Sequence, residues 1–112
     1  IGDKMDESQL LKGILEACVL KIISQKETYG YQIIIELAEA GFNNVIEGTL
    51  YPILTRLEKK KYIQCRKAKS PLGPTRKYFS ITTLGQEHLD NYLITYKNTI
   101  DKTNHLLFDK KI

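Results

Sequence analysis

Residues 47–63 read EGTLYPILTRLEKKKYI, and this stretch decides the fold class of the chain. Its apolar side chains recur three and four positions apart, as on one buried face of a helix. They are Leu50, Ile53, Leu54 and Leu57. Pro52 is tolerated only near the first turn of a helix, where its missing N–H would be unpaired in any case. The stretch therefore predicts a helix that begins at about residues 47–49 and turns its polar side chains outward.

A basic hairpin is expected directly after this helix. Residues 62–67 and 75–82 alternate apolar with more polar side chains, which indicates two strands, and the loop at residues 68–74 contains two prolines and a glycine. From residue 56 to residue 78 the chain carries +8, whereas the net charge of the whole chain is only +4. Such a local charge is typical of a surface that binds nucleic acid or an anionic membrane, although a merely solvated surface fits the charge equally well.

A long helix is predicted over residues 83–107, after a capping-box pattern at Thr83-x-x-Gln86. Its roughly 25 residues would span about 37 Å, which is more than a small domain can cover. Apolar side chains recur along it in threes and fours, as in a short coiled-coil seam, so we expect this seam to form a dimer interface. The seam residues are Leu89, Leu93, Tyr96, Ile100 and Leu107.

Two further helices are predicted before residue 47. The first is expected to be continuous from residue 7 or 8 to about residue 24, and a polar turn at residues 25–28 follows it. Tyr29-Gly30-Tyr31 then opens the second helix, which Gly41 ends. The order of three helices, hairpin and long helix is that of a winged helix-turn-helix, whose third helix enters the major groove of DNA. The expected fold is therefore mainly α, with a small β-hairpin wing and a long C-terminal dimerisation helix.

The chain of 112 residues is expected to bury a single core. Residues 5–82 are predicted to form the winged helix-turn-helix DNA-binding domain, and residues 83–108 the C-terminal dimerisation helix. Residues 1–4 precede Met5 and are expected to be a remnant of the expression vector.

The sequence contains no pattern of an enzyme, a metal site or a cofactor site. Walker, GxSxG and HExxH motifs are absent, and His88 and His105 have no acidic or cysteine partner at ligand spacing. Cys18 and Cys65 are expected to be reduced core residues. The longest apolar run is four residues, and no signal-peptide pattern is found, so we expect a cytoplasmic protein that does not cross a membrane.

Three segments carry a family resemblance: Tyr29-Gly30-Tyr31-Gln32-Ile33, residues 47–63, and residues 73–89, which read GPTRKYFSITTLGQEHL. In this order and spacing they resemble the PadR family of bacterial winged-helix transcriptional regulators, in particular its short-tailed group with one C-terminal helix. The resemblance implies a homodimeric repressor with residues 47–63 supplying the recognition helix and the hairpin acting as the wing. It also implies a dimer interface made by the C-terminal helix together with the first helix, which adds Leu11 to the seam.

The resemblance assigns DNA-binding roles to particular residues. Thr49, Tyr51 and Pro52 would lie at the groove-facing start of the recognition helix, with Tyr31 and Gln32 beside the DNA backbone. Arg56, Lys60, Lys69, Arg76 and Lys77 complete the predicted double-stranded DNA contacts. One position departs from the family pattern, because Lys61 stands where a glycine is usual. If that residue is left-handed, the lysine costs on the order of 1 kcal/mol.

The aromatic side chains of the C-terminal helix leave two interpretations open. Tyr92, Tyr96 and Phe108 could line a pocket for a small aromatic or apolar effector at the dimer centre, or they could be ordinary seam and core residues. The predicted function is a repressor that binds a pseudo-palindromic operator and is released by such an effector. The alternatives are a winged-helix module that binds an acidic protein partner, and a small-molecule sensor whose DNA role is secondary.

Overall fold

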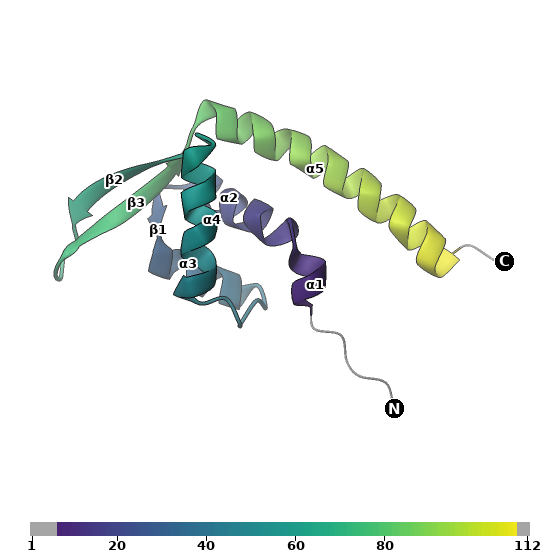
Figure 1. Ribbon diagram of the computed structural model, residues 1–112, viewed down its shortest axis with the longest axis horizontal. Helices are drawn as coiled ribbons and strands as arrows, with labels where there is room; N and C mark the ends of the chain where they lie inside the picture. The colour runs from purple at the N-terminus through teal and green to yellow at the C-terminus, as the bar shows by residue number, and fades with distance from the viewer. Residues whose placement is uncertain (1–6, 110–112) are drawn as a thin grey trace.

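The computed structural model describes residues 7–109, so the expected vector remnant at residues 1–4 lies outside the described part. The helices are α1 (Ser8–Leu11), α2 (Ile14–Gln25), α3 (Gly30–Glu39), α4 (Glu47–Lys59) and α5 (Thr83–Asn104), which a π-helical turn at His105–Asp109 extends. The strands are β1 (Thr28–Tyr29), β2 (Ile63–Lys69) and β3 (Thr75–Ile81). The wing and α5 both start near the C-terminal end of α4 and extend in opposite directions (Figure 1). The predicted mainly helical fold with a small β wing is confirmed.

The core lies between α2, α3 and α4, and the start of α5 and the root of the wing close it. All four apolar residues predicted for the inner face of α4 are buried, which confirms that face. The other core side chains come from every neighbouring element: Leu15, Val19, Leu20, Ile23, Ile33, Leu37, Val45, Ile63, Phe79 and Leu89. Gly41 adopts φ +105° directly after α3, as the expected left-handed stop requires.

The first helix is not continuous, which corrects the prediction. Gly13 adopts φ +82° and separates α1 from α2. A left-handed residue interrupts the hydrogen-bond ladder of a helix, and glycine adopts this conformation without a steric cost. Leu10 precedes the break and is 64% exposed, so it does not continue the buried stripe of α2.

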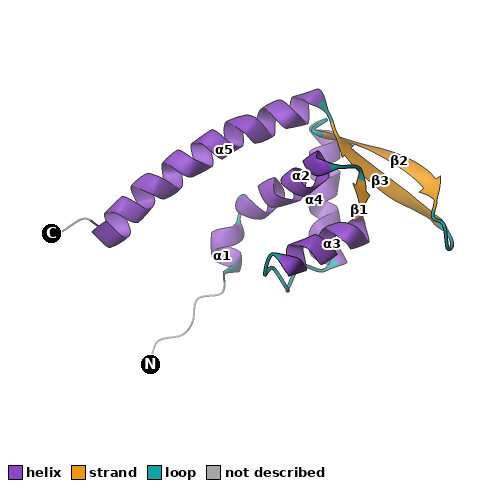
Figure 2. Ribbon diagram, turned by 180° about the vertical axis from the view of Figure 1, so that it is seen from behind, coloured by secondary structure: helices purple, strands orange, loops and turns teal. Residues whose placement is uncertain are grey.

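The wing has a third strand that sequence periodicity did not reveal. β1 pairs with β3 through Thr28↔Phe79 and Tyr29↔Tyr78, where the end of a turn and the start of a helix were expected, and the strand order is β1-β3-β2 (Figure 2). Two residues are too few to show the alternation by which a strand is identified. The hairpin itself runs in register from Ile63↔Ile81 to Lys69↔Thr75, so the loop is shorter than expected and covers residues 70–74.

The junction of α4, wing and α5 is built around the carbonyl group of Tyr62. The backbone N–H of Thr82 donates to this oxygen over 3.0 Å. The Thr82 hydroxyl lies 2.6 Å from the Lys61 carbonyl and 3.1 Å from that of Tyr62. Gly85 packs so closely against Tyr62 that a Cβ there would overlap its carbonyl oxygen. These contacts join the end of α4 to the first turn of α5.

Thr82, rather than Thr83, caps α5. Its hydroxyl oxygen accepts a hydrogen bond of 3.0 Å from the Gly85 N–H. The N-cap was predicted at Thr83 and lies one residue earlier, at Thr82. Thr82 has the extended backbone (φ −92°, ψ 169°) that an N-cap needs, whereas Thr83 is already helical.

Lys61 has φ +66°, the left-handed conformation expected for the family's glycine position. We expect Lys61→Gly to raise the free energy of unfolding by about 1 kcal/mol, because it removes the clash of a Cβ in this conformation. Urea denaturation followed by circular dichroism measures the change. The matched control is Lys60→Gly, since Lys60 has φ −78° and glycine there should lower stability. Equal destabilisation by both variants would contradict the assignment of strain to Lys61.

Candidate nucleic-acid interface

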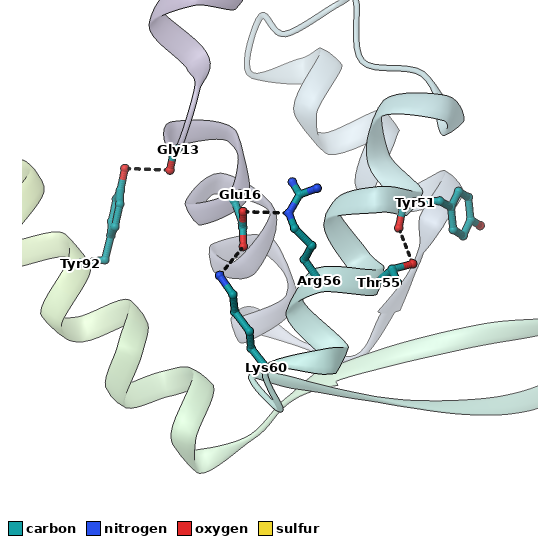
Figure 3. A network of polar contacts seen from close by, with 7 residues as sticks. All are labelled: Gly13, Glu16, Tyr51, Thr55, Arg56, Lys60 and Tyr92. Atoms are coloured by element: carbon teal, nitrogen blue, oxygen red, sulfur yellow. Dashed lines mark hydrogen bonds and ion pairs between the residues drawn. The ribbon is translucent and has the colours of Figure 1, made fainter.

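The exposed face of α4 is the centre of the candidate interface. α3 and α4 pack together as the two helices of a helix-turn-helix, and α4 turns its buried face toward α2 and α3. Helical geometry then directs Pro52, Thr55 and Lys59 outward, and all three are exposed. The Thr55 hydroxyl donates to the Tyr51 carbonyl over 2.9 Å (Figure 3). The exposed face thus combines a proline and a small hydroxyl side chain with a cation, Lys59, at its C-terminal end.

Tyr51 lies on the side of α4 that faces the start of α3 and the wing. Its ring covers Gly30, where a Cβ would come within 2.6 Å of the Tyr51 hydroxyl oxygen. Close packing against glycine fixes the ring, yet the residue remains 42% exposed. Tyr31 is adjacent on α3 and is 65% exposed. Gln32 is half-buried and donates to Glu36 on its own helix over 3.2 Å.

Arg56 and Lys60 lie on the opposite side of α4, toward α2. The Glu16 carboxylate is 3.6 Å from Arg56 Nε and 3.8 Å from Lys60 Nζ (Figure 3). Thr49 and Arg56 also line a cavity of about 350 Å³ between α4 and the α1–α2 junction. Because both cations are more than half exposed, each pair contributes well under about 1 kcal/mol to stability. The pairing nevertheless turns these two predicted DNA contacts away from the wing.

Two lysines lie directly opposite each other on the wing. Lys67 pairs with Lys77 in the β2–β3 register, so both side chains project from the same face of the sheet. This is the face that carries Phe79 into the core, and further along it lie Thr75 and Lys69. No carboxylate within residues 7–109 forms an ion pair with either lysine. Like charges directly across a sheet lower stability, and an anion bound between the two lysines would offset this cost.

A concavity separates this lysine pair from the recognition helix. Its volume is about 450 Å³, and it is lined by Tyr51, Lys67, Thr75, Arg76 and Lys77. The two lysines offer ammonium groups, Thr75 a hydroxyl and Tyr51 a phenol, and these are donors that bind phosphate oxygens in protein–DNA complexes.

The other face of the wing holds the two arginines. Arg76 stacks on Tyr29 with its guanidinium carbon 3.9 Å from the ring centroid. Arg66 donates two hydrogen bonds of 2.7 Å to Glu27. The bidentate bonds from Arg66 lower the pKa of Glu27 and raise that of Arg66. Arg76 and Lys77, which were predicted together as DNA contacts, therefore start from opposite faces of β3.

Sequence reasoning did not select three residues of this surface: Thr55, Lys59 and Lys67. The signal for Lys67 is the hairpin register, since a five-residue loop at 70–74 sets Lys67 opposite Lys77. The signal for Thr55 and Lys59 is the helical period itself, because both lie opposite the buried face of α4.

The apolar seam of α5 divides into a buried start and an exposed remainder. Leu89 is only 1% exposed and belongs to the core of this chain, which corrects its assignment to a dimer interface. Leu93 is 44% exposed, and the seam continues through Tyr96, Ile100 and Leu107, which are also accessible. Leu11 is half-buried beside the α1–α2 junction. The change occurs because α2 faces the first half of α5, where the Tyr92 hydroxyl reaches the Gly13 carbonyl, and the rest of α5 extends past α2 (Figure 1).

An apolar groove of about 370 Å³ runs between α2, α3 and α5. Tyr92 and Tyr96 line it with their rings stacked at a centroid distance of 6.0 Å, and the Tyr92 hydroxyl donates to the Gly13 carbonyl over 3.3 Å (Figure 3). Burial raises the pKa of Tyr92 and of Cys18 in the same groove. Phe108 does not line this groove and is exposed on the final turn.

From residue 7 to residue 109, no helix is both long and apolar enough to cross a membrane. In the same part of the chain, His, Cys, Asp and Glu side chains do not gather in groups of three or more that could hold a metal ion.

Comparison with known proteins identifies the family. The model of the PadR-like transcriptional regulator family matches residues 19–91. The crystal structure of a PadR-like regulator from Bacillus cereus is 43% identical with a TM-score of 0.81, and the match covers 91% of this chain and 99% of that chain. A Streptococcus transcriptional regulator is 44% identical with a TM-score of 0.79, covering 88% and 96% of the two chains. An uncharacterized protein X from Lysinibacillus sphaericus is 37% identical over 87 residues, which are 76% of this chain and 80% of that protein.

The two solved structures match the fold described above over most of this chain, and the family is one of transcription regulators that bind DNA. The chain therefore belongs to the PadR-like family of transcriptional regulators.

Proposed function

We propose that the protein is a homodimeric repressor that binds a pseudo-palindromic operator, with α4 in the major groove and the wing on the adjacent phosphates. The observation that carries this proposal is that Lys67 and Lys77 lie opposite each other on the wing, and neither forms an ion pair with a carboxylate of the described residues. Both line the concavity that Tyr51 also lines. A phosphate in this concavity would relieve the repulsion between the two ammonium groups. Its proposed site of action is the cytoplasm, where a bacterial operator is found.

Base readout is assigned to the exposed face of α4. Thr49, Pro52 and Thr55 present short side chains, which allow the helix backbone to approach the base edges. Tyr31 and Tyr51 are exposed beside them and would donate hydrogen bonds to phosphates, together with Gln32 once it leaves Glu36. Lys59 and Lys69 would extend the phosphate contacts, and Arg56 and Lys60 would join them only after they leave Glu16.

Dimerisation is assigned to the exposed part of the α5 seam, with Leu11 at its edge. A helix that projects from its own domain with Leu93, Tyr96, Ile100 and Leu107 accessible would bury these side chains against a second copy. A two-fold symmetric pair then reads two half-sites about one DNA turn, or roughly 34 Å, apart.

A small aromatic or apolar effector is proposed for the groove between α2, α3 and α5. The lining by Tyr92 and Tyr96 supports this site, whereas Phe108 would contribute only if the partner chain supplied it. Binding there would displace α5 from α2 and alter the spacing of the two recognition helices, which would release the operator.

Affinity for DNA should depend strongly on salt. Fluorescence anisotropy on the promoter of the protein's own gene should show a logarithm of affinity that falls linearly with the logarithm of salt concentration, because cations at the interface release counterions. Absence of binding at low salt would contradict the proposal, as would binding insensitive to salt. A protein partner that is retained on the basic face after nuclease treatment would instead favour the interaction-module alternative.

Lys77→Ala should weaken DNA binding and raise the free energy of unfolding. The variant loses one phosphate contact, so the salt slope should decrease by about one unit. It also removes a like-charge cross-strand pair, so the free energy of unfolding should rise by about 0.2–1 kcal/mol. Anisotropy and urea denaturation measure the two effects. Lys102→Ala is the matched control, since Lys102 is an exposed lysine on α5 away from the wing and should change neither quantity. An unchanged slope in Lys77→Ala would refute the phosphate contact.

Ile100→Asp should abolish dimerisation. A carboxylate in the seam would have to lose its water shell on association. Sedimentation equilibrium at micromolar concentration should give twice the chain mass of 12.9 kDa for the wild type and the single mass for the variant. Ile94→Asp serves as the control, because Ile94 is 64% exposed on another side of α5 and should leave the dimer intact. A monomeric wild type would overturn the proposal.

A further inference from the structure

Arg76 is held on the outer face of the wing by aromatic rings. Its guanidinium carbon lies 3.9 Å from the centroid of Tyr29 and 5.5 Å from that of Tyr78. The two rings meet edge to face at a centroid distance of 5.8 Å. Arg66 covers Tyr78 from the next strand at 5.0 Å. The outer face is thus a continuous stack of cations and tyrosines that crosses all three strands.

The stack rather than hydrogen bonding holds the Arg76 side chain. Its Nε is buried and has no hydrogen-bond partner among the described residues. A guanidinium plane over an aromatic face gains cation–π and dispersion energy that a flexible ammonium gains less fully. The side chain therefore stays on the tyrosine rings even though its Nε–H donor has no hydrogen-bond acceptor there, which costs free energy.

The contact links the free end of the wing to the start of α3. β1 pairs with β3 at only two positions, and Arg76 lies two residues beyond the last of them. Its side chain reaches back to Tyr29, the N-cap residue of α3. Gly30 follows in the chain and lies directly under Tyr51 of α4. One path of contacts therefore runs from wing to Tyr29, Gly30 and Tyr51.

We propose that Arg76 is a positioning residue, which sets the angle between the wing and the recognition helix by stacking on Tyr29 and does not serve as a phosphate counter-charge. This inference rests on the proposed DNA-binding function, in which Lys67 and Lys77 make the phosphate contacts. It differs from the sequence-based expectation that Arg76 and Lys77 act alike.

The first test uses the free protein and needs no DNA. Tyr29→Leu and Arg76→Gln should each accelerate amide hydrogen exchange at residues 75–78 by about tenfold, while α2 keeps its protection. Tyr29→Phe retains the ring and should exchange like the wild type. The control Tyr31→Leu removes a neighbouring tyrosine that has no such stack and should also leave exchange at the wing unchanged. Wild-type exchange at residues 75–78 in both Tyr29→Leu and Arg76→Gln would overturn the proposal.

The second test measures operator affinity as a double-mutant cycle. Tyr29→Leu and Arg76→Gln should weaken binding equally, within about twofold, and the double variant should be no weaker than either, because both remove one interaction. Arg76→Lys keeps the charge and should fail to restore wild-type affinity. Full affinity in Arg76→Lys, or an unaffected Tyr29→Leu, would make Arg76 a phosphate contact and overturn the proposal. If the wild type bound no DNA, the proposed function would fail, whereas hydrogen exchange would still decide the role of the stack.

Discussion

The carbonyl group of Tyr62 is the point on which the arrangement of the functional parts depends. It accepts the backbone N–H of Thr82, lies beside the Thr82 hydroxyl and packs on the Cα of Gly85. α4 ends just before it, the wing begins just after it, and the first turn of α5 covers it. The left-handed Lys61 turns the chain into this contact. α4, the wing and α5 therefore meet at one joint, so a movement of α5 would also shift α4 and the wing.

Six of the nine cations in residues 56–78 fall into three structural environments. Arg56 and Lys60 face Glu16, whereas Arg66 and Arg76 are held on the outer face of the wing by Glu27 and by tyrosine rings. Lys67 and Lys77 alone form an opposed pair beside the concavity next to Tyr51. Exposed ion pairs are weak, so an anion would compete for Arg56, Lys60 and Arg66, whereas the stack on Tyr29 holds Arg76. Lys67 and Lys77 have no acidic partner to give up among the described residues, so the functional proposal rests on them.

The long helix α5 serves two purposes along its length. Its start supplies Leu89 to the core, and its remainder carries an accessible seam away from the domain. Periodicity alone cannot separate these parts, because a helix buried by its own domain and one buried by a partner show the same spacing of apolar residues. The change in exposure from 1% at Leu89 to 44% at Leu93 marks the boundary between the two parts.

The sequence by itself determined the order and type of the main elements, the buried face of α4, the stop at Gly41 and the family. These properties arise from local spacing and backbone preference, which each segment carries alone. Only the tertiary structure decided the break at Gly13, the short strand β1, the burial of Leu89 and the partners of the cations. Gly13 could have been an ordinary helical residue, and two residues show no strand period. The charge pairs join Glu16 to Arg56 and Glu27 to Arg66, residues far apart in the chain. Their distances depend on how the helices and the wing pack, and no local pattern encodes that.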